Sequence, residues 1–223
     1  MKNNAVILQH VYTKTDMFGN AFVDMLRLTT LRHMAYANGH NMDYWAFQGG
    51  LEKEHKMEAG AWAKIDLMKM ALEQDYEYVF WIDADAAIMD FSTDLRDSVK
   101  DIHIGACVHD PAKSDYLKNL NIARHVNVGV MYLRNTNETR KFVQAWYDSY
   151  PGVPRWAEQG SFNNLLVSMP GIVTEIDDKW NATVNVNMVE KPVVKGYHGV
   201  MPVIDRFGLM RADCIEDHIV YRV

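Results

Sequence analysis

The stretch Tyr78-Val-Phe-Trp-Ile-Asp83-Ala-Asp85-Ala-Ala-Ile-Met89 joins an apolar run to two aspartates that lie two positions apart. The run predicts a buried strand over residues 78–82, and alternate side chains of a strand point to the same face. We therefore expect the carboxylates of Asp83 and Asp85 to lie side by side at the end of this strand. Neighbouring carboxylates repel each other, and a hard divalent cation, often carrying phosphate, is the usual partner of such a pair.

A solvated turn is the alternative interpretation of Asp83 and Asp85, since aspartate is common in turns. The apolar residues 86–89 resume directly after the pair, and polar residues between two buried segments need a partner. The pair therefore indicates a metal site and a nucleotide-dependent enzyme.

The rest of the chain alternates between strand and helix patterns. We predict strands over residues 6–8, 44–47, 102–108, 125–133 and 172–176, and helices over residues 20–37, 61–74, 138–150 and 158–169. Residues after 176 are expected to be irregular, with Gly and Pro spread through them. This alternation predicts an α/β fold with a mainly parallel sheet. The aspartate pair would then lie at the carboxyl ends of strands, where open α/β sheets bind ligands.

Composition narrows the classes of partner. The chain has 223 residues, is 48% hydrophobic and has a formal net charge of −6, so charge gives no case for binding nucleic acid or anionic membrane. The apolar run at residues 5–8 is too short for a signal peptide or a membrane span. Cys107 and Cys214 are too few for a disulfide framework. We therefore expect a soluble, cytoplasmic protein of one domain over residues 1–223, without a membrane span.

Other residues are candidates for the same chemistry, each with a plain structural alternative. His198, followed by Gly199, would complete a metal site and favour Mn²⁺ over Mg²⁺, although a lone histidine is more often a surface loop residue. Asn127-Val-Gly129 lies within a predicted strand, where glycine marks either close approach of a ligand or a bulge.

Two further candidates lie on predicted helices. Glu158-Gln159 opens a helix, where a carboxylate gains from the helix dipole whether or not it has a function. Lys64 could face a phosphate or solvent.

In order and spacing, these segments resemble the GT-A glycosyltransferases that carry a DxD motif. The segments are Trp62-Ala-Lys64, Trp81-Ile-Asp-Ala-Asp-Ala-Ala-Ile88, Asn127-Val-Gly129 with Leu133-Arg-Asn135, Glu158-Gln159 and His198-Gly199. The resemblance covers roughly residues 60–200. It is nearest to the galactosyl/mannosyl/xylosyl transferases that decorate fungal and plant glycans, and the chain is also similar to glycosyltransferase domains of large chlorella-type viruses.

The resemblance implies a Rossmann-like three-layer α/β/α sandwich, with a nucleotide-binding part over about residues 1–100 and an acceptor side over about residues 101–223. It implies transfer of a hexose or deoxyhexose from a UDP-sugar to a glycan or glycoprotein acceptor, with retention. Mn²⁺ would be the cofactor, with Mg²⁺ as the alternative. Asp83, Asp85 and His198 match the metal ligands, and Glu158, Gln159 and Asp85 match catalytic positions. The remaining residues that match nucleotide-sugar contacts are Gln9, His10, Val11, Tyr12, Thr13, Lys64, Ala84, Asn127 and Gly199.

Three rival functions stay open from the residues alone. A nucleotidyltransferase would want a Gly-rich basic loop after the first strand, and residues 11–19 are a poor version of one. A phosphatase with Asp83 as nucleophile would want Thr or Val at position 87, where the chain has Ala87. A non-catalytic sugar-nucleotide or glycan-binding module would not need the aspartate pair. The sequence decides neither the acceptor nor the oligomeric state.

Overall fold

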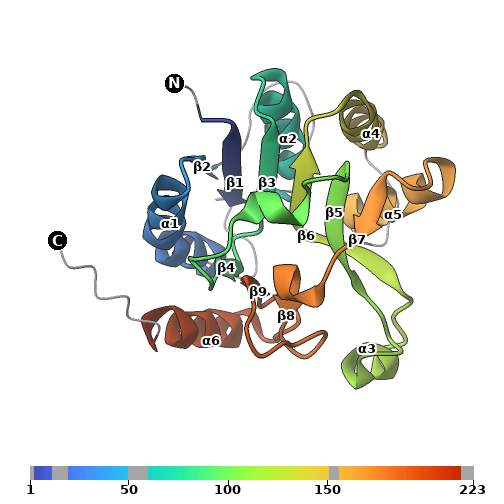
Figure 1. The fold of residues 1–223 in the computed structure, drawn as a ribbon. Helices are drawn as coiled ribbons and strands as arrows, with labels where there is room; N and C mark the ends of the chain where they lie inside the picture. The colour runs from blue at the N-terminus through green and yellow to red at the C-terminus, as the bar shows by residue number, and fades with distance from the viewer. Residues whose placement is uncertain (1–2, 12–19, 50–59, 151–155, 217–223) are drawn as a thin grey trace.

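The computed structural model describes residues 3–11, 20–49, 60–150 and 156–216. Its central sheet has the strand order β2-β1-β3-β6-β5-β7 (Figure 1). These strands are β1 (Ala5–Val11), β2 (Asp43–Gln48), β3 (Tyr78–Ile82), β5 (Ile104–His109), β6 (His125–Arg134) and β7 (Val173–Glu175). β6 runs antiparallel to both of its neighbours, β3 and β5, and the remaining strands share one direction. The prediction of an α/β fold with a mainly parallel sheet is confirmed.

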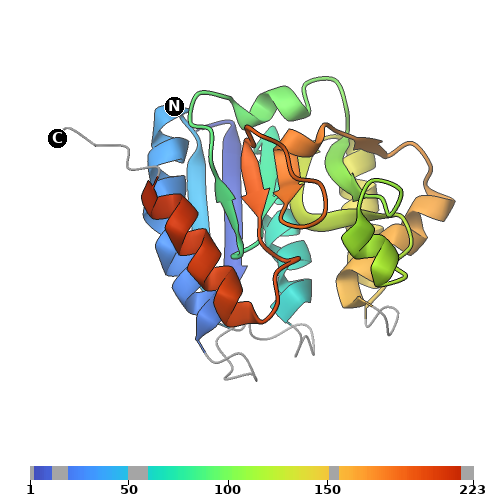
Figure 2. The same cartoon turned by 90° about the horizontal axis from the view of Figure 1, so that it is seen from below.

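Helices cover both faces of this sheet. α2 (Ala63–Glu73), α4 (Asn137–Asp148) and α5 (Ala157–Ser168) pack on one face. The other face is covered by α1 (Ala21–Gly39) and by a small sheet of β4 (Ala86–Ile88), β9 (Val194–Gly196) and β8 (Ala182–Thr183). α6 (Val203–Glu216) lies along α1, as Figure 2 shows, and the short helix α3 (Asp115–Asn119) lies between β5 and β6. This is the predicted three-layer α/β/α sandwich.

The pleat of the central strands divides the core into its two faces. In β1, Leu8 packs toward α2, whereas Ile7 packs toward α1. In β3, Trp81 packs toward α2 and Phe80 packs toward α1. Because side chains alternate along a strand, the residues that follow Leu8 in β1 also point to opposite faces.

A bulge interrupts β6 opposite β5. The register shifts between Ala106 and Val108, and β6 carries the excess residues, since Ala106 faces Met131 but Val108 faces Val126. Val128 and Met131 lie on the same face although an odd number of positions separates them. An extra residue in one strand bends it and re-aims its side chains. The bulge that the sequence left as an alternative at Asn127–Gly129 is therefore present.

The C-terminal region differs from the prediction. Residues after 176 were expected to be irregular, yet they form β8, β9 and the helix α6. Val203, Arg206 and Met210 of α6 are buried at helical spacing. Because the charged Arg206 interrupts the apolar face, the sequence pattern did not predict this helix. In α1, Met34 is 43% exposed, whereas Tyr36 is fully buried.

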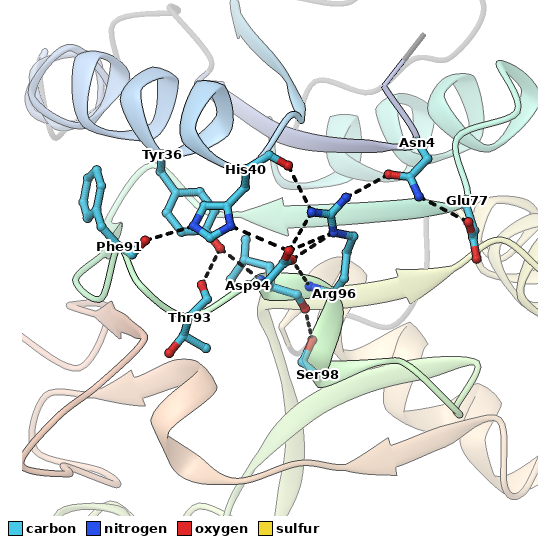
Figure 3. A network of polar contacts seen from close by, with 10 residues as sticks. Asn4, Tyr36, His40, Glu77, Phe91, Thr93, Asp94, Arg96 and Ser98 are labelled. Carbon is cyan, nitrogen blue, oxygen red and sulfur yellow. Dashed lines mark hydrogen bonds and ion pairs between the residues drawn. The ribbon is translucent and has the colours of Figure 1, made fainter. Parts of the chain in front are cut away.

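A polar network fixes the amino ends of the strands, at the edge remote from the aspartate pair (Figure 3). The Arg96 guanidinium donates to Asp94 at 2.6 Å, to Asn4 at 3.0 Å and to the carbonyl of His40 at 3.0 Å. Tyr36 of α1 donates to the Thr93 carbonyl at 2.6 Å. These bonds join the start of β1, the end of α1 and the segment after β4.

Across the described ranges, no helix has the length and apolar character that crossing a bilayer requires.

Candidate active site

The aspartate pair lies in a turn between β3 and β4. Asp83 N donates to the Gly129 carbonyl at 2.7 Å, and Ala86 N donates to the Asp83 carbonyl at 3.0 Å. The two carboxylates then take different partners. Asp83 accepts from Trp81 Nε1 at 2.6 Å, whereas Asp85 is only 4% exposed and pairs with a guanidinium from α6. Burial raises the pKa of Asp83, and the nearby charge of Asp85 adds to this while Lys64 opposes it.

Lys64 of α2 is the buried cation of the site. Its ammonium lies 3.1 Å from Asp83 Oδ1 and 3.1 Å from Glu158 Oε1, and it donates to the Val128 carbonyl at 3.3 Å. Burial would lower the pKa of Lys64, but the two carboxylates outweigh it and raise that pKa above its ordinary value. An ammonium has three donors, so all of them have acceptors here. Lys64 would meet a phosphate only by giving up one of these bonds.

Glu158 and Gln159 are brought to the same place by the first turn of α5. The indole of Trp146 donates to the Glu158 carbonyl at 2.8 Å, which fixes the start of the helix against α4. Gln159 Oε1 accepts from Val128 N at 3.1 Å. Glu158 is 7% exposed. It therefore forms a buried ion pair with Lys64 in addition to any favourable interaction with the helix dipole. The predicted Glu-Gln pair and Lys64 thus meet at the backbone of β6.

Asn127 and His198 are joined by hydrogen bonds. Asn127 Oδ1 accepts from Gly129 N at 2.9 Å and from Asn181 Nδ2 at 2.8 Å, so its amide group faces His198 Nε2 at 3.1 Å. Thr183 Oγ1 also lies 3.1 Å from His198 Nε2. Burial lowers the pKa of His198 to about 4, although Asp83 acts to raise it. His198 is therefore a neutral imidazole, the form that binds metals.

Glycines keep the centre of the site open. A Cβ on Gly129 would lie 3.0 Å from Asp83 Oδ2, 3.1 Å from Asn127 Oδ1 and 3.6 Å from His198 Cε1. Gly129 therefore marks the point where all three side chains converge. A Cβ on Gly199 would overlap the carbonyl oxygen of Val184, so that glycine is required by the close approach of its loop to the segment after β8.

The residue types at this edge of the sheet suit a divalent cation. Asp83, Asp85 and His198 supply carboxylate and imidazole donors, and His198 Nδ1 is buried with no hydrogen-bond partner among the described residues. Asn181 Oδ1 is in the same condition. Within residues 3–11, 20–49, 60–150 and 156–216, however, no three His, Cys, Asp or Glu side chains are close enough together to hold an ion. Cations of the protein engage both aspartates instead.

The β1 segment predicted to contact the nucleotide divides between the two faces. Gln9 is fully buried and points toward α1, where its Oε1 accepts from His33 at 2.8 Å and from Tyr44 at 2.6 Å. Its amide donates to the Asp83 carbonyl at 3.3 Å, so Gln9 supports the aspartate turn. His10 points the other way, toward Asp83 and Lys64, and its Nε2 lies 2.7 Å from the Gly49 carbonyl.

Val11 and Ala84, two further predicted contacts, contribute apolar side chains. Val11 and Ala84 are buried together in an apolar cluster with Val23 and Leu26. Tyr12 and Thr13 lie outside the described residues.

A row of aromatic rings leads away from His198. His109, at the end of β5, stacks on His198 with ring centroids 5.4 Å apart, and it faces His125 at 5.3 Å. His125 in turn lies 4.7 Å from the ring of Trp156, which is 36% exposed. Burial lowers the pKa of His109 to about 2, with smaller contributions from the other two histidines. Sequence reasoning missed His109 and His125, although both lie where predicted strands end or begin at the same sheet edge.

Comparisons with known proteins bear on the family and the fold of the chain. A family model described as "Nucleotide-diphospho-sugar transferase" matches residues 22–218. Two curated proteins named "Probable glycosyltransferase 6", from the japonica and indica subspecies of Oryza sativa, are 35% and 34% identical over 104 residues. That segment covers 45% of this chain and 20% of each rice protein.

A solved structure is similar over almost the whole chain. It is the structure of a glycosyltransferase involved in the glycosylation of the major capsid of PBCV-1. The TM-score is 0.70 at 15% identity, covering 93% of this chain and 98% of that one. At this level of identity the likeness supports the fold, and it agrees with the resemblance to viral and plant glycosyltransferases found in the sequence.

Proposed function

Because the chain belongs to the nucleotide-diphospho-sugar transferase family, we propose that it moves a hexose or deoxyhexose from a UDP-sugar to a glycan or glycoprotein acceptor. The observation that carries this proposal is the convergence on Gly129 of groups from distant parts of the chain. Asp83, Asn127 and His198 lie around the space that a Cβ would fill there. The site is at the carboxyl ends of β1, β3 and β5, which is where open α/β sheets bind nucleotides.

Within this proposal, Asp83, Asp85 and His198 would hold Mn²⁺, with Mg²⁺ as the alternative. A bound cation would neutralise negative charge on the departing diphosphate, as a Lewis acid does. The imidazole of His198 favours Mn²⁺, since nitrogen ligands suit transition metals better than Mg²⁺. The nucleotide would lie against β1, with His10 nearest to Asp83.

The sugar would lie toward Glu158 and Gln159. Transfer breaks the bond between the anomeric carbon and the β-phosphate oxygen, forms a bond to an acceptor hydroxyl and releases that hydroxyl's proton. Positive charge develops at the anomeric centre, and the Glu158 carboxylate is a fixed negative group that stabilises it. Lys64 holds Glu158 and Asp83 together at 3.1 Å from each, so both ends of the donor would be positioned by one ammonium. Retention at the anomeric carbon follows from the family resemblance.

Calorimetry with UDP, UDP-glucose and GDP-mannose, with and without Mn²⁺, tests the donor. We expect UDP and UDP-glucose to bind, and removal of Mn²⁺ to weaken binding by about tenfold or more. Asp83→Asn should do the same, whereas Asp97→Asn, at an exposed carboxylate remote from the site, is the matched control. Binding of UDP that is indifferent to Mn²⁺ and to Asp83→Asn would remove the basis for this proposal.

Product analysis separates the rival functions. A transferase releases UDP from UDP-glucose when an acceptor sugar is present. A nucleotidyltransferase would instead form pyrophosphate from UTP and a sugar phosphate, and a binding module would bind the donor unchanged.

The cysteine content supports a cytoplasmic location for this reaction.

A further inference from the structure

Arg206 of α6 is the partner of Asp85. Its Nη1 donates to Asp85 Oδ2, and the two side chains are only 9% and 5% exposed. Its Nη2 donates to the His198 carbonyl at 3.1 Å and to the Val200 carbonyl at 3.2 Å, and Nε donates to Val200 at 3.3 Å. One guanidinium therefore joins α6 to the aspartate turn and to the loop that carries His198.

This contact has a clear electrostatic reason. A carboxylate as buried as Asp85 is costly unless a cation accompanies it. Lys64 is already bound to Asp83 and Glu158, so Arg206 is the cation that serves Asp85. The turn itself is held in place separately, because Tyr197 N donates to the Asp85 carbonyl at 2.9 Å.

The same carboxylate is one of the proposed metal ligands. A divalent cation and a guanidinium repel each other, and a hard cation needs carboxylate oxygens, of which Asp85 Oδ2 is occupied by Arg206. We propose that Arg206 is the counter-ion of Asp85 in the metal-free protein, and that a divalent cation must compete with Arg206 for this carboxylate. The inference rests on the proposed metal dependence and adds a residue that sets metal affinity.

The rest of α6 has its own attachment. Asp213, one of the last residues of the helix, accepts from Lys195 at 2.6 Å and from Tyr197 at 2.7 Å. Loss of the Arg206 contact therefore leaves the C-terminal half of α6 bound to β9. We expect metal binding to loosen the first turns of α6 and to leave its end in place.

Mn²⁺ titration followed by electron paramagnetic resonance tests the competition without any activity measurement. Arg206→Gln should bind Mn²⁺ about tenfold more tightly than the wild type, because the competing charge is gone. Its melting temperature should be lower without metal and should rise more on adding Mn²⁺. Lys195→Gln is the matched control, since it removes a cation between β9 and α6 that does not touch Asp85. Equal or weaker Mn²⁺ binding by Arg206→Gln would overturn the inference.

Hydrogen exchange of the wild type gives a second measurement that needs no variant. Amides of residues 203–208 should exchange faster when Mn²⁺ is added, while those of residues 209–216 should not change. Unchanged or slower exchange at residues 203–208 in metal-bound protein would contradict the competition and leave metal dependence intact. If neither wild type nor variant binds Mn²⁺ but both bind UDP, the competition and the metal part of the proposed function fail together, and the transferase assignment survives.

Discussion

The ammonium of Lys64 lies 3.1 Å from the carboxylate of Glu158, although the two residues belong to helices α2 and α5 on different parts of the chain. Both side chains are buried, at 4% and 10% exposure. Removing an ion pair from water has a desolvation cost, and the attraction between the charges offsets it only when the geometry is good and further hydrogen bonds are made. Removing one partner is therefore far more costly than removing a surface pair.

Lys64→Met should destabilise the protein by about 3 to 5 kcal/mol, because it leaves Asp83 and Glu158 facing each other without a cation. The double variant Lys64→Met/Glu158→Gln should recover part of this loss. Lys69→Met is the control on the same helix, where the ammonium lies over the Tyr147 ring, and it should cost no more than about 1 kcal/mol. Urea unfolding measures all three, and equal losses for the two single Lys→Met variants would contradict the role given to Lys64.

Gly129→Ala should weaken both the fold and nucleotide binding. Its Cβ would press on Asp83 and Asn127 at 3.0 and 3.1 Å, and overpacking of this kind costs about 1 to 3 kcal/mol. UDP affinity in Mn²⁺ should fall by about tenfold or more, since the shifted groups line the proposed site. Gly39→Ala places a Cβ in open space and serves as the control. Unchanged UDP affinity in Gly129→Ala would show that the site lies elsewhere.

His33 should make the protein less stable in mild acid. Its Nε2 accepts from Ile88 N at 3.1 Å and its Nδ1 donates to Gln9 at 2.8 Å, so the neutral ring is fully hydrogen-bonded. Burial lowers its pKa to about 3, and the charge of Arg32 adds to this. Unfolded histidine titrates near pH 6.5, so its contribution is complete above that pH. As the pH falls from about 6.5 toward 3, the unfolded state gains the proton first and stability drops.

The size of this effect is about 1.4 kcal/mol per pH unit for one histidine. Urea unfolding at pH 7.0 and at pH 5.5 measures it. His33→Gln should be less stable at pH 7.0 but should lose less stability between the two pH values than the wild type. If the two proteins lose the same amount, His33 is not the titrating group.

Gly208→Ala should stabilise the protein by about 0.5 to 1 kcal/mol. Gly208 lies inside α6, and a Cβ there meets nothing within 4 Å. Alanine costs less backbone entropy than glycine in a helix. The gain in urea midpoint checks that residues 203–216 form a helix in solution. A loss of stability would contradict the assignment of α6.

The sequence by itself determined the fold class and the place of the aspartate pair. An apolar run of five residues, 78–82, ends at Asp83, and strand and helix patterns alternate on either side of it. These are local properties, since side-chain periodicity and the end of an apolar run depend on near neighbours alone. Ile65, Met68 and Leu72 recur at helical spacing in the sequence, and all three are buried in α2.

Only the tertiary structure decided which charges meet. The spacing of Asp83 and Asp85 suggested one shared environment, yet Asp83 pairs with Lys64 and Asp85 pairs with Arg206. The bulge in β6 places Asn127 and Gly129 beside Asp83. Ion pairs form between groups that folding brings together, and their strength depends on burial and distance. No local pattern contains that information, which is why Arg206 emerged only once α6 was packed against the aspartate turn.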